Sequence, residues 1–255
     1  MGVPCSPFSW CKLCRREVVL WFASRRRQAR QQNAPAETED PRLASDRSKP
    51  MSILVIGGHS RSVGKTSVVA GLIAALPEFH WIACKITQYG HGLCSADGQA
   101  CDCATGDHAW AITEEKNPGG ESDTSRFLAA GAVRAWWVRT EQGRLAEAMP
   151  ALRAHLAGQN AILESNSVLR FLHPDLYLTV LDPSTADFKT SAREFLDRAD
   201  AVILHKTAAG FSWKDVSLKP VSGRPVFHIA PPPYLTSEIA QFVRQKLGAS
   251  AAGSL

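Results

Sequence analysis

No stretch of this sequence approaches the ~18–20 continuous apolar residues that a membrane-spanning helix requires. The longest early apolar run, Val18 to Ala23, is too short for the core of a signal peptide. The basic cluster Arg25 to Arg27 also follows this run, whereas a signal peptide carries its positive charges before the apolar core. We therefore expect a cytoplasmic protein with no membrane partner.

The body of the chain also lacks an excess of positive charge. The whole sequence has 29 Lys and Arg against 24 Asp and Glu, a net charge of +5, but residues 1–50 alone carry 10 against 5. Subtracting these leaves 19 of each sign in residues 51–255. Because nucleic-acid binding depends on clustered positive charge, we expect no nucleic-acid partner.

The number of cysteines is also not even, as a set of disulfide pairs would require. The chain has seven cysteines and no export signal, which argues against a disulfide framework. Reduced thiols or a metal site are the alternatives.

Residues 1–50 differ from the rest in composition, with an Arg-rich run followed by Gln, Asn, Ala, Pro and acidic residues. This composition predicts a disordered leader. Met51 stands directly before the first predicted strand, so translation that begins at Met51 is an open alternative. We expect one nucleotide-binding domain over residues 51–248 and a flexible tail over 249–255.

The stretch from Ser52 to Ile73 predicts a strand, a phosphate-binding loop and a helix. The apolar run Ile53 to Ile56 enters a loop rich in Gly and Ser, and apolar residues at helical spacing follow it. Backbone N–H groups of such a loop bind phosphate, while its Lys reaches the β- and γ-phosphates and its Thr hydroxyl binds Mg²⁺. The expected nucleotide-binding residues here are Gly58, Ser62, Val63, Gly64, Lys65, Thr66 and Ser67, with Thr66 also a Mg²⁺ ligand.

Five residues separate Gly58 from Gly64, one more than the usual pattern places between its first Gly and Gly-Lys. An ordinary Gly-rich turn that happens to carry a Lys is the alternative to a phosphate loop. The order of strand, Gly64-Lys65-Thr66 and helix favours the phosphate loop.

An acidic residue, Glu164, ends the strand predicted in the segment from Asn160 to Asn166. Ala161 to Leu163 are apolar throughout, which favours a strand buried on both faces. A carboxylate at the end of such a strand can hold Mg²⁺ or orient an attacking water. We therefore interpret Glu164 as a catalytic and metal-binding residue beside Lys65, the alternative being a carboxylate that faces solvent.

Two lysines follow other predicted strands. Lys85 lies near the end of the run from His80 to Ile86, and Lys206 follows the run from Ala201 to Leu204. The carboxyl ends of strands in an open α/β sheet face the ligand, so both lysines are candidates to contact the nucleotide or an acidic substrate. For Lys85, a solvated lysine at a strand end is the alternative. Asp123 is predicted either to cap a short helix or to line the site.

Residues 88–122 form an unusually long connection, rich in Gly, Asp, Asn and Pro. Thiolate and imidazole groups are ligands that Zn²⁺ prefers, and four of them make a tetrahedral site. The candidate ligands are Cys94, Cys101, Cys103 and one histidine, His108 or His91. Free thiols in a mobile loop are the alternative.

The whole pattern predicts an α/β fold with a doubly wound, mainly parallel sheet of about seven strands. The predicted strands cover residues 53–56, 80–86, 135–139, 160–164, 175–181, 201–204 and 225–229.

From Met51 to about Leu247 the chain resembles the P-loop NTPase class that includes dethiobiotin synthetase and the MobB family of molybdopterin-guanine dinucleotide biosynthesis adaptor proteins. The five-residue gap before Gly64-Lys65-Thr66 is similar to the dethiobiotin synthetase loop. The segment from Asp123 to Ala132 and the strand ending Ile162-Leu163-Glu164 resemble MobB.

The resemblance implies a P-loop NTPase fold, Mg²⁺-dependent binding and weak hydrolysis of GTP or ATP, and a role in molybdenum cofactor biosynthesis. It also implies a pterin cofactor or a cofactor-synthesis protein as partner, and a homodimer is open. An ATP-dependent ligase of the dethiobiotin type and a nucleotide-switched metal carrier remain alternatives. The sequence departs from guanine-binding relatives at Ala208, where they carry Asp, so the choice between GTP and ATP stays open.

Overall fold

The computed structural model of the chain describes residues 52–90, 109–207, 213 and 216–252, all of which belong to the unit Lys49–Leu255. The predicted leader, residues 1–50, and the candidate zinc ligands therefore lie outside the described residues. Among the residues described, no helix is long and apolar enough to cross a bilayer.

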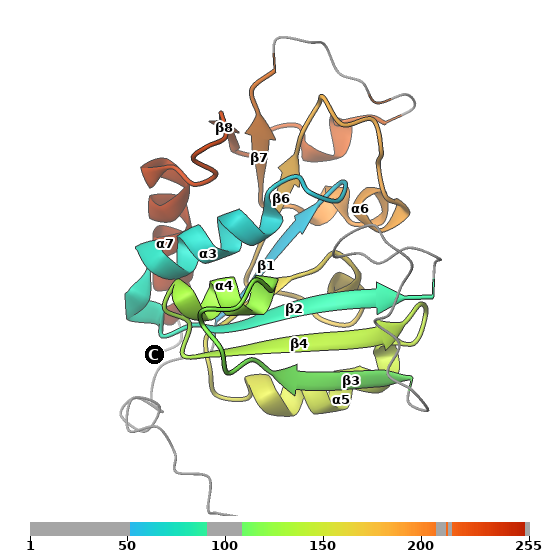
Figure 1. Ribbon diagram of the computed structural model, residues 1–255. Coiled ribbons are helices and arrows are strands. Elements are labelled where there is room, and N and C mark those ends of the chain that lie inside the picture. The colour runs from blue at the N-terminus through green and yellow to red at the C-terminus, as the bar shows by residue number, and fades with distance from the viewer. Residues whose placement is uncertain (1–51, 91–108, 208–212, 214–215, 253–255) are drawn as a thin grey trace, which may run out of the picture. The chain divides into compact units, whose positions relative to one another are not determined.

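A single sheet of eight strands runs through the described part of the chain (Figure 1). Its order is β3-β4-β2-β5-β1-β6-β7-β8, and every neighbouring pair is parallel except β3 with β4. The strands are β1 (Ile53–Gly58), β2 (Ile82–Tyr89), β3 (Trp110–Glu114), β4 (Arg134–Glu141), β5 (Ala161–Glu164), β6 (Leu176–Leu181), β7 (Ala201–His205) and β8 (Val226–Ile229). The predicted mainly parallel α/β fold is confirmed.

The eighth strand corrects the sequence interpretation. β3 lies inside the connection predicted for residues 88–122, and β2 extends into the same connection as far as Tyr89. β3 pairs antiparallel with the edge of the sheet, and Trp110 lies opposite Thr140. Its five residues are too few to show a period against the Gly- and Asp-rich surroundings, so long-range pairing rather than local pattern makes it a strand.

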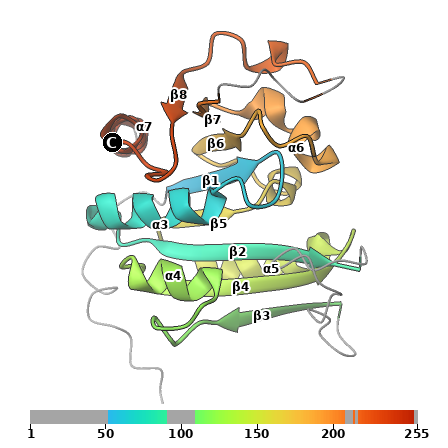
Figure 2. The ribbon, with the colours of Figure 1, turned by 45° about the horizontal axis from the view of Figure 1, so that its top comes forward.

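Helices cover both faces of this sheet, as Figure 2 shows. On one face lie α3 (Lys65–Ala75), α4 (Asp123–Ala129) and α7 (Ser237–Ala252), and on the other lie α5 (Leu145–Leu156) and α6 (Thr190–Glu194). α7 continues to Ala252, where a flexible tail is predicted from residue 249. The alanines after Leu247 favour helix although they belong to no apolar stripe.

The core consists of two layers, one on each side of the central strands. Along β1, Leu54 and Ile56 pack into the cluster that holds α3 and α7, whereas Val55 packs into the cluster that holds α5. All three side chains are fully buried. A strand covered on both faces is apolar at successive positions, which explains the continuous runs in β1, β5 and β6.

Candidate nucleotide-binding site

The loop between β1 and α3 is tied to the strand beside it by one side chain, Asn166. Its Oδ1 accepts from the Gly58 N–H at 2.9 Å, and its Nδ2 donates to the Gly58 carbonyl at 2.8 Å. Asn166 follows β5 by two residues, so this paired contact links the start of the loop to the end of the strand that carries Glu164. A Cβ on Gly58 would also lie 3.0 Å from the Lys65 stem and from Val63. A side chain at position 58 would therefore crowd Lys65 and Val63.

His59, the first of the five residues between the two glycines, is completely buried. Its Nδ1 donates to the Asp187 carbonyl at 2.7 Å and its Nε2 accepts from the Asp182 N–H at 3.0 Å, so the ring is the neutral Nδ1–H tautomer. Burial lowers the pKa of His59, and the carbonyl contact opposes this only in part. The Lys189 N–H in turn donates to the His59 carbonyl at 2.8 Å. His59 thereby fastens the phosphate loop to the segment between β6 and α6.

A second histidine holds the other end of the loop. The His205 Nε2 lies 3.0 Å from the Val63 carbonyl and donates to it, at the end of β7. The ring of Tyr234 makes an edge contact with His205, with the ring centroids 5.9 Å apart. The end of β7, which leads to Lys206, thus supports the backbone of the loop through His205.

The N-terminus of α3 is open to an anion. Gly64 caps the helix in the left-handed conformation, with φ of 88°, and no side chain of the described residues caps the first turn. The first turn also contains no acidic residue. The unpaired N–H groups and the positive end of the helix dipole are therefore left for an external ligand, and phosphate fits both. Ser62, earlier in the loop, also has a positive φ, 55°.

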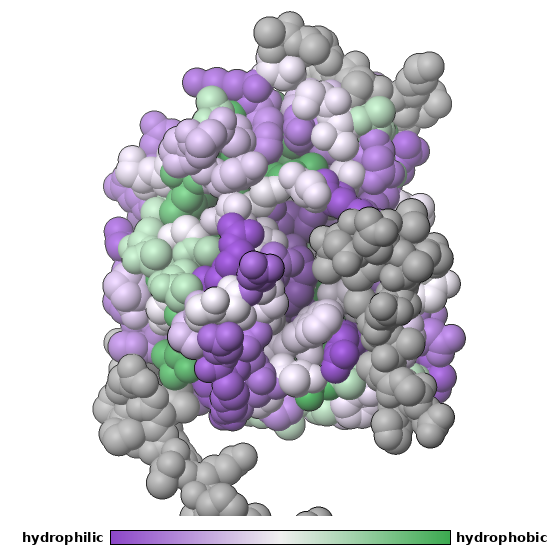
Figure 3. Space-filling view, in the orientation of Figure 1, coloured by the Kyte–Doolittle hydropathy of each residue, from purple (hydrophilic) through white to green (hydrophobic). Residues whose placement is uncertain are grey.

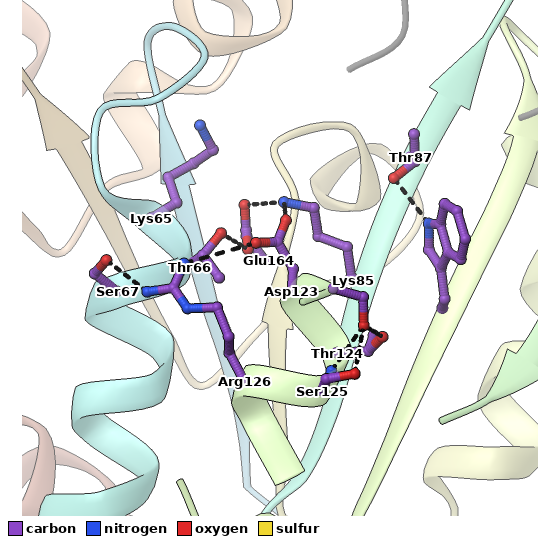
Figure 4. Close-up of polar contacts among 12 residues, drawn as sticks. Lys65, Thr66, Ser67, Lys85, Thr87, Asp123, Thr124, Ser125, Arg126 and Glu164 are labelled. Atoms are coloured by element: carbon purple, nitrogen blue, oxygen red, sulfur yellow. Dashed lines mark hydrogen bonds and ion pairs between the residues drawn. The ribbon is translucent and has the colours of Figure 1, made fainter. Parts of the chain in front are cut away.

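Lys65, the first residue of α3, turns back over the loop. In Figure 4 its side chain extends away from Thr66 and Glu164, and its Nζ donates to the Ser60 carbonyl at 2.6 Å. Burial lowers the pKa of Lys65 to about 8, and the Glu164 carboxylate offsets only part of this effect. A cation held in this way gains strongly from an incoming anion, because the anion replaces lost hydration.

Thr66 and Glu164 meet at the centre of the site (Figure 4). The Thr66 hydroxyl donates to Glu164 Oε2 at 2.8 Å, and Lys85 Nζ donates to Glu164 Oε1 at 2.5 Å. Glu164 is only 3% exposed, so this carboxylate is not the solvated strand end that the sequence left open. Two donors on two different oxygens satisfy the buried charge.

Lys85 also binds a second carboxylate, that of Asp123, with Nζ 2.8 Å from Oδ2. Burial by itself would lower the pKa of Lys85, but Glu164 and Asp123 together outweigh it and raise this pKa. The lysine contacts both carboxylates at once, so it is not the solvated side chain that was the alternative for this residue.

Asp123 begins α4, but it is not the helix cap. Ser122 is the N-cap, and its hydroxyl accepts from the Ser125 N–H at 3.0 Å. The prediction of Asp123 as a cap was wrong because both residues are good caps, and the Asp side chain is drawn instead to the cation on β2. Burial would raise the pKa of Asp123, and Lys85 reverses this and lowers it. α4 thus brings a second carboxylate to the site.

The same helix contacts α3 directly. Arg126 donates from Nη2 to the Ser67 hydroxyl at 3.0 Å, as Figure 4 shows, and its Nη1 lies 3.9 Å from Asp123 Oδ1. Figure 3 shows hydrophilic side chains gathered in the middle of this face of the molecule, where α3 and α4 lie. Ser67, expected at the phosphate loop, is therefore engaged with α4.

The oxygens at the centre of the site fit a Mg²⁺ ion. Thr66 offers a hydroxyl, while Glu164 and Asp123 offer carboxylates, and hard oxygen donors of this kind are the ligands that Mg²⁺ prefers. Cys84 is buried in the core and burial raises its pKa to about 12, which makes it a poor metal ligand. In the described part of the chain no three His, Cys, Asp or Glu residues form a cluster suited to holding a metal by themselves. A Mg²⁺ ion here would need further ligands from the nucleotide or water.

The remaining predicted residues are not all brought together. Lys206 has an exposed side chain, and its N–H donates to the Ile229 carbonyl at 2.7 Å as β7 ends. The candidate zinc ligands Cys94, Cys101, Cys103 and His108, with His91, lie outside the described residues.

Sequence reasoning missed three supports of the site: Asn166, His59 and the role of His205 at Val63. Each acts through a residue more than a hundred positions away in the chain. No local sequence pattern at these three residues points to their partners.

Comparison with known proteins gives a limited result. The chain matches no model of a known protein family, and no curated protein is significantly similar to it. Among solved structures it is similar to LpxK from Aquifex aeolicus in complex with ATP, with 15% identity and a TM-score of 0.41, over 70% of this chain and 54% of that one. It is also similar to HypB from Helicobacter pylori in complex with nickel, with 14% identity and a TM-score of 0.42, over 79% and 89% of the two chains.

A third similar structure is Signal Recognition Particle 54 kDa protein from Aeropyrum pernix K1 in complex with GDP, with 15% identity and a TM-score of 0.38, over 84% of this chain and 49% of that one. The chain thus spans about half the length of two of these three structures. Likenesses this loose carry no information on substrate or pathway, and the chemistry of the site rests on its own geometry.

Proposed function

We propose that this protein binds a nucleoside triphosphate with Mg²⁺ at the phosphate loop and hydrolyses it slowly, in a MobB-like role in molybdenum cofactor biosynthesis. The hydrogen bond between the Thr66 hydroxyl and the buried Glu164 carboxylate is the observation that carries the proposal. It brings the loop hydroxyl and a strand-end carboxylate within reach of one cation, beside a helix N-terminus that no described side chain caps.

Each residue then has a defined task. The N–H groups of the loop and of the first turn of α3 hold the phosphates, and Lys65 leaves the Ser60 carbonyl to pair with the β- and γ-phosphates. Thr66 and Glu164 would hold Mg²⁺, which neutralises charge on the phosphates when it is bound. Glu164 would also orient an attacking water toward the terminal phosphate.

The ligase alternative is weakened by the surroundings of Lys85. If the protein were a ligase of the dethiobiotin type, this lysine would contact a carboxylate substrate. Lys85 already forms ion pairs with Glu164 and Asp123, which neutralise its charge. A cation between two carboxylates attracts a third only weakly. The MobB-like reading needs no such contact and is supported by the resemblance of the segment from Asp123 to Ala132.

Titration with a fluorescent triphosphate analogue, with and without Mg²⁺, tests the nucleotide site. Lys65→Ala removes a charge-assisted hydrogen bond worth about 2 kcal/mol, so we expect affinity to fall about 30-fold. Thr66→Val preserves shape and removes the hydroxyl, so it should abolish the gain in affinity that Mg²⁺ gives while leaving Mg²⁺-free binding intact. Lys116→Ala and Thr190→Val, both at exposed positions, are the matched controls.

Unchanged binding in Lys65→Ala would overturn the nucleotide site. A competition between GTP and ATP addresses the finer proposal, because a MobB-like role predicts a preference for GTP. A clear preference for ATP would count against the molybdenum cofactor role and leave triphosphate binding standing.

A further inference from the structure

Among the described helices, those over the face of the sheet that carries Lys85 cover only part of it. α4 contacts β2 and β4, and Figures 1 and 2 show it over the first half of these strands. Beyond α4, toward the carboxyl ends, no described helix lies over this face. The opposite face has α5 along β3 and β4. The partly covered face begins directly beside the candidate nucleotide site, because Lys85 belongs to both.

Register places a row of polar and aromatic side chains on this face. Lys85 of β2 is paired with Trp137 of β4, and Thr87 is paired with Arg139. Because side chains alternate along a strand, these four residues share one face with Ala83, which packs in the cluster of α3 and α7. Thr113 of the antiparallel edge strand is opposite Trp137 and so joins them.

The side chains of this row hold one another in place. Trp137 Nε1 donates to the Thr87 hydroxyl at 3.1 Å, and Figure 4 shows this bond at Thr87, on the strand that carries Lys85. The Arg139 guanidinium lies 4.7 Å from the centre of the Trp137 ring, and its Nη2 donates to the Thr113 hydroxyl at 3.1 Å. An arginine held by stacking and one hydrogen bond loses little further freedom when it binds a ligand.

Arg139 has no carboxylate partner in the part of the chain that the structure describes. Among the described residues no carboxylate lies within ion-pair distance of it, and its buried Nε has no hydrogen-bond partner. Arg134, on the same strand, does have such a partner, Glu114. A buried, unsatisfied donor on a charged group is costly, and an oxyanion with two oxygens would satisfy Nε and the guanidinium together.

We propose that this half-covered face binds an oxyanion-bearing acceptor molecule, with Arg139 as the residue that holds its carboxylate or phosphate. The proposal rests on the proposed function, since the acceptor would extend from Arg139 toward Lys85 and the triphosphate. Arg139 lies on the strand next to that of Lys85 and two residues further along it, so their Cα atoms are about 8 Å apart. A molecule of one ring, with an anion at one end, spans this distance.

Calorimetric titration with phenyl phosphate and, separately, with benzoate tests the site and distinguishes a phosphate from a carboxylate ligand. The protein is first saturated with Mg²⁺ and a non-hydrolysable triphosphate, so that the phosphate loop is occupied. We expect one probe to bind, and Arg139→Ala to weaken it at least tenfold. Arg139→Lys, which keeps the charge but lacks Nε and the planar fork, should weaken it by less.

Arg153→Ala is the matched control, because Arg153 lies on α5 at the opposite face and bonds one carbonyl, that of Phe171. It should leave the probe affinity within twofold, and both alanine variants should leave the triphosphate affinity within twofold. The proposal is overturned if neither probe binds, or if Arg139→Ala lowers only the melting temperature and not the affinity for the probe. The benzoate titration is also repeated without nucleotide, so that the oxyanion site is tested even if the protein binds no triphosphate.

Discussion

The lowered pKa of Lys65 predicts a specific pH dependence for triphosphate binding. An anion beside Lys65 favours its charged form, so the bound state holds the proton well above pH 8, whereas the free protein releases it with a pKa of about 8. Above pH 8 each binding event must therefore take up one proton, and apparent affinity falls as pH rises. Phosphate groups lose their last proton near pH 6, about two pH units lower, and do not contribute.

The magnitude follows from the fraction of Lys65 that is protonated in the free protein. With a pKa of about 8 this fraction is about 0.9 at pH 7 and about 0.1 at pH 9, so the affinity should fall about tenfold over this range. A lysine with the ordinary pKa of about 10.4 would stay protonated, and the affinity would change by a few per cent. A fluorescence titration at pH 7, 8 and 9 measures the difference.

Two variants assign the proton to its residue. Lys65→Arg keeps a positive charge at every pH tested, so its affinity should not depend on pH. Burial also lowers the pKa of Lys189, so Lys189→Arg is the second control and should retain the slope. An affinity of the unmodified protein that stays flat from pH 7 to pH 9 would refute the reasoning, and so would a slope that Lys189→Arg abolishes.

Two further predictions concern stability, measured by urea unfolding. Gly64→Ala should lower the free energy of unfolding by more than about 2 kcal/mol, because φ is 88° and the new Cβ would lie 2.1 Å from an adjacent tyrosine ring. Gly143→Ala is the control: its φ is 87° but the new Cβ would meet open space, so the loss should be about 1 kcal/mol. Equal losses would refute the contact. Lys85→Met should lower the free energy of unfolding by about 3 kcal/mol, because it leaves the buried Glu164 carboxylate without its cation. Lys116→Met, which removes an exposed lysine from its ion pair, should lower it by less than about 1 kcal/mol. A small loss in Lys85→Met would mean that the pair is not buried in solution.

The sequence predicts those parts of the molecule that depend on local pattern. The segments Ile53 to Ile56 and Ala161 to Leu163 belong to strands whose two faces are both buried. Such strands are apolar at successive positions, so their continuous apolar runs could be recognised in the sequence. The helix after Gly64 is also predicted, since its apolar residues recur at helical spacing. Glu164 could be placed at the end of its strand, but its bonds to Thr66 and Lys85 depend on the order of strands in the sheet.

Features that depend on distant pairing were missed. β3 is a strand because β4 lies beside it, and its own residues show no clear period. Ser122 and Asp123 are both suitable helix caps, and only the position of Lys85 across the sheet decides which of them caps α4. Asn166 carries no sequence signal that points to Gly58, since their contact arises from the parallel pairing of β1 with β5.

The ties on His59 have a consequence for the kinetics of ligand capture. Bonds from His59, Asn166 and His205 hold both ends of the phosphate loop before any nucleotide arrives. A loop that is already ordered loses little conformational entropy on binding, and no folding step stands between encounter and complex. We therefore expect association to be fast and set by diffusion and orientation, so that differences in affinity among nucleotides would arise from their residence times.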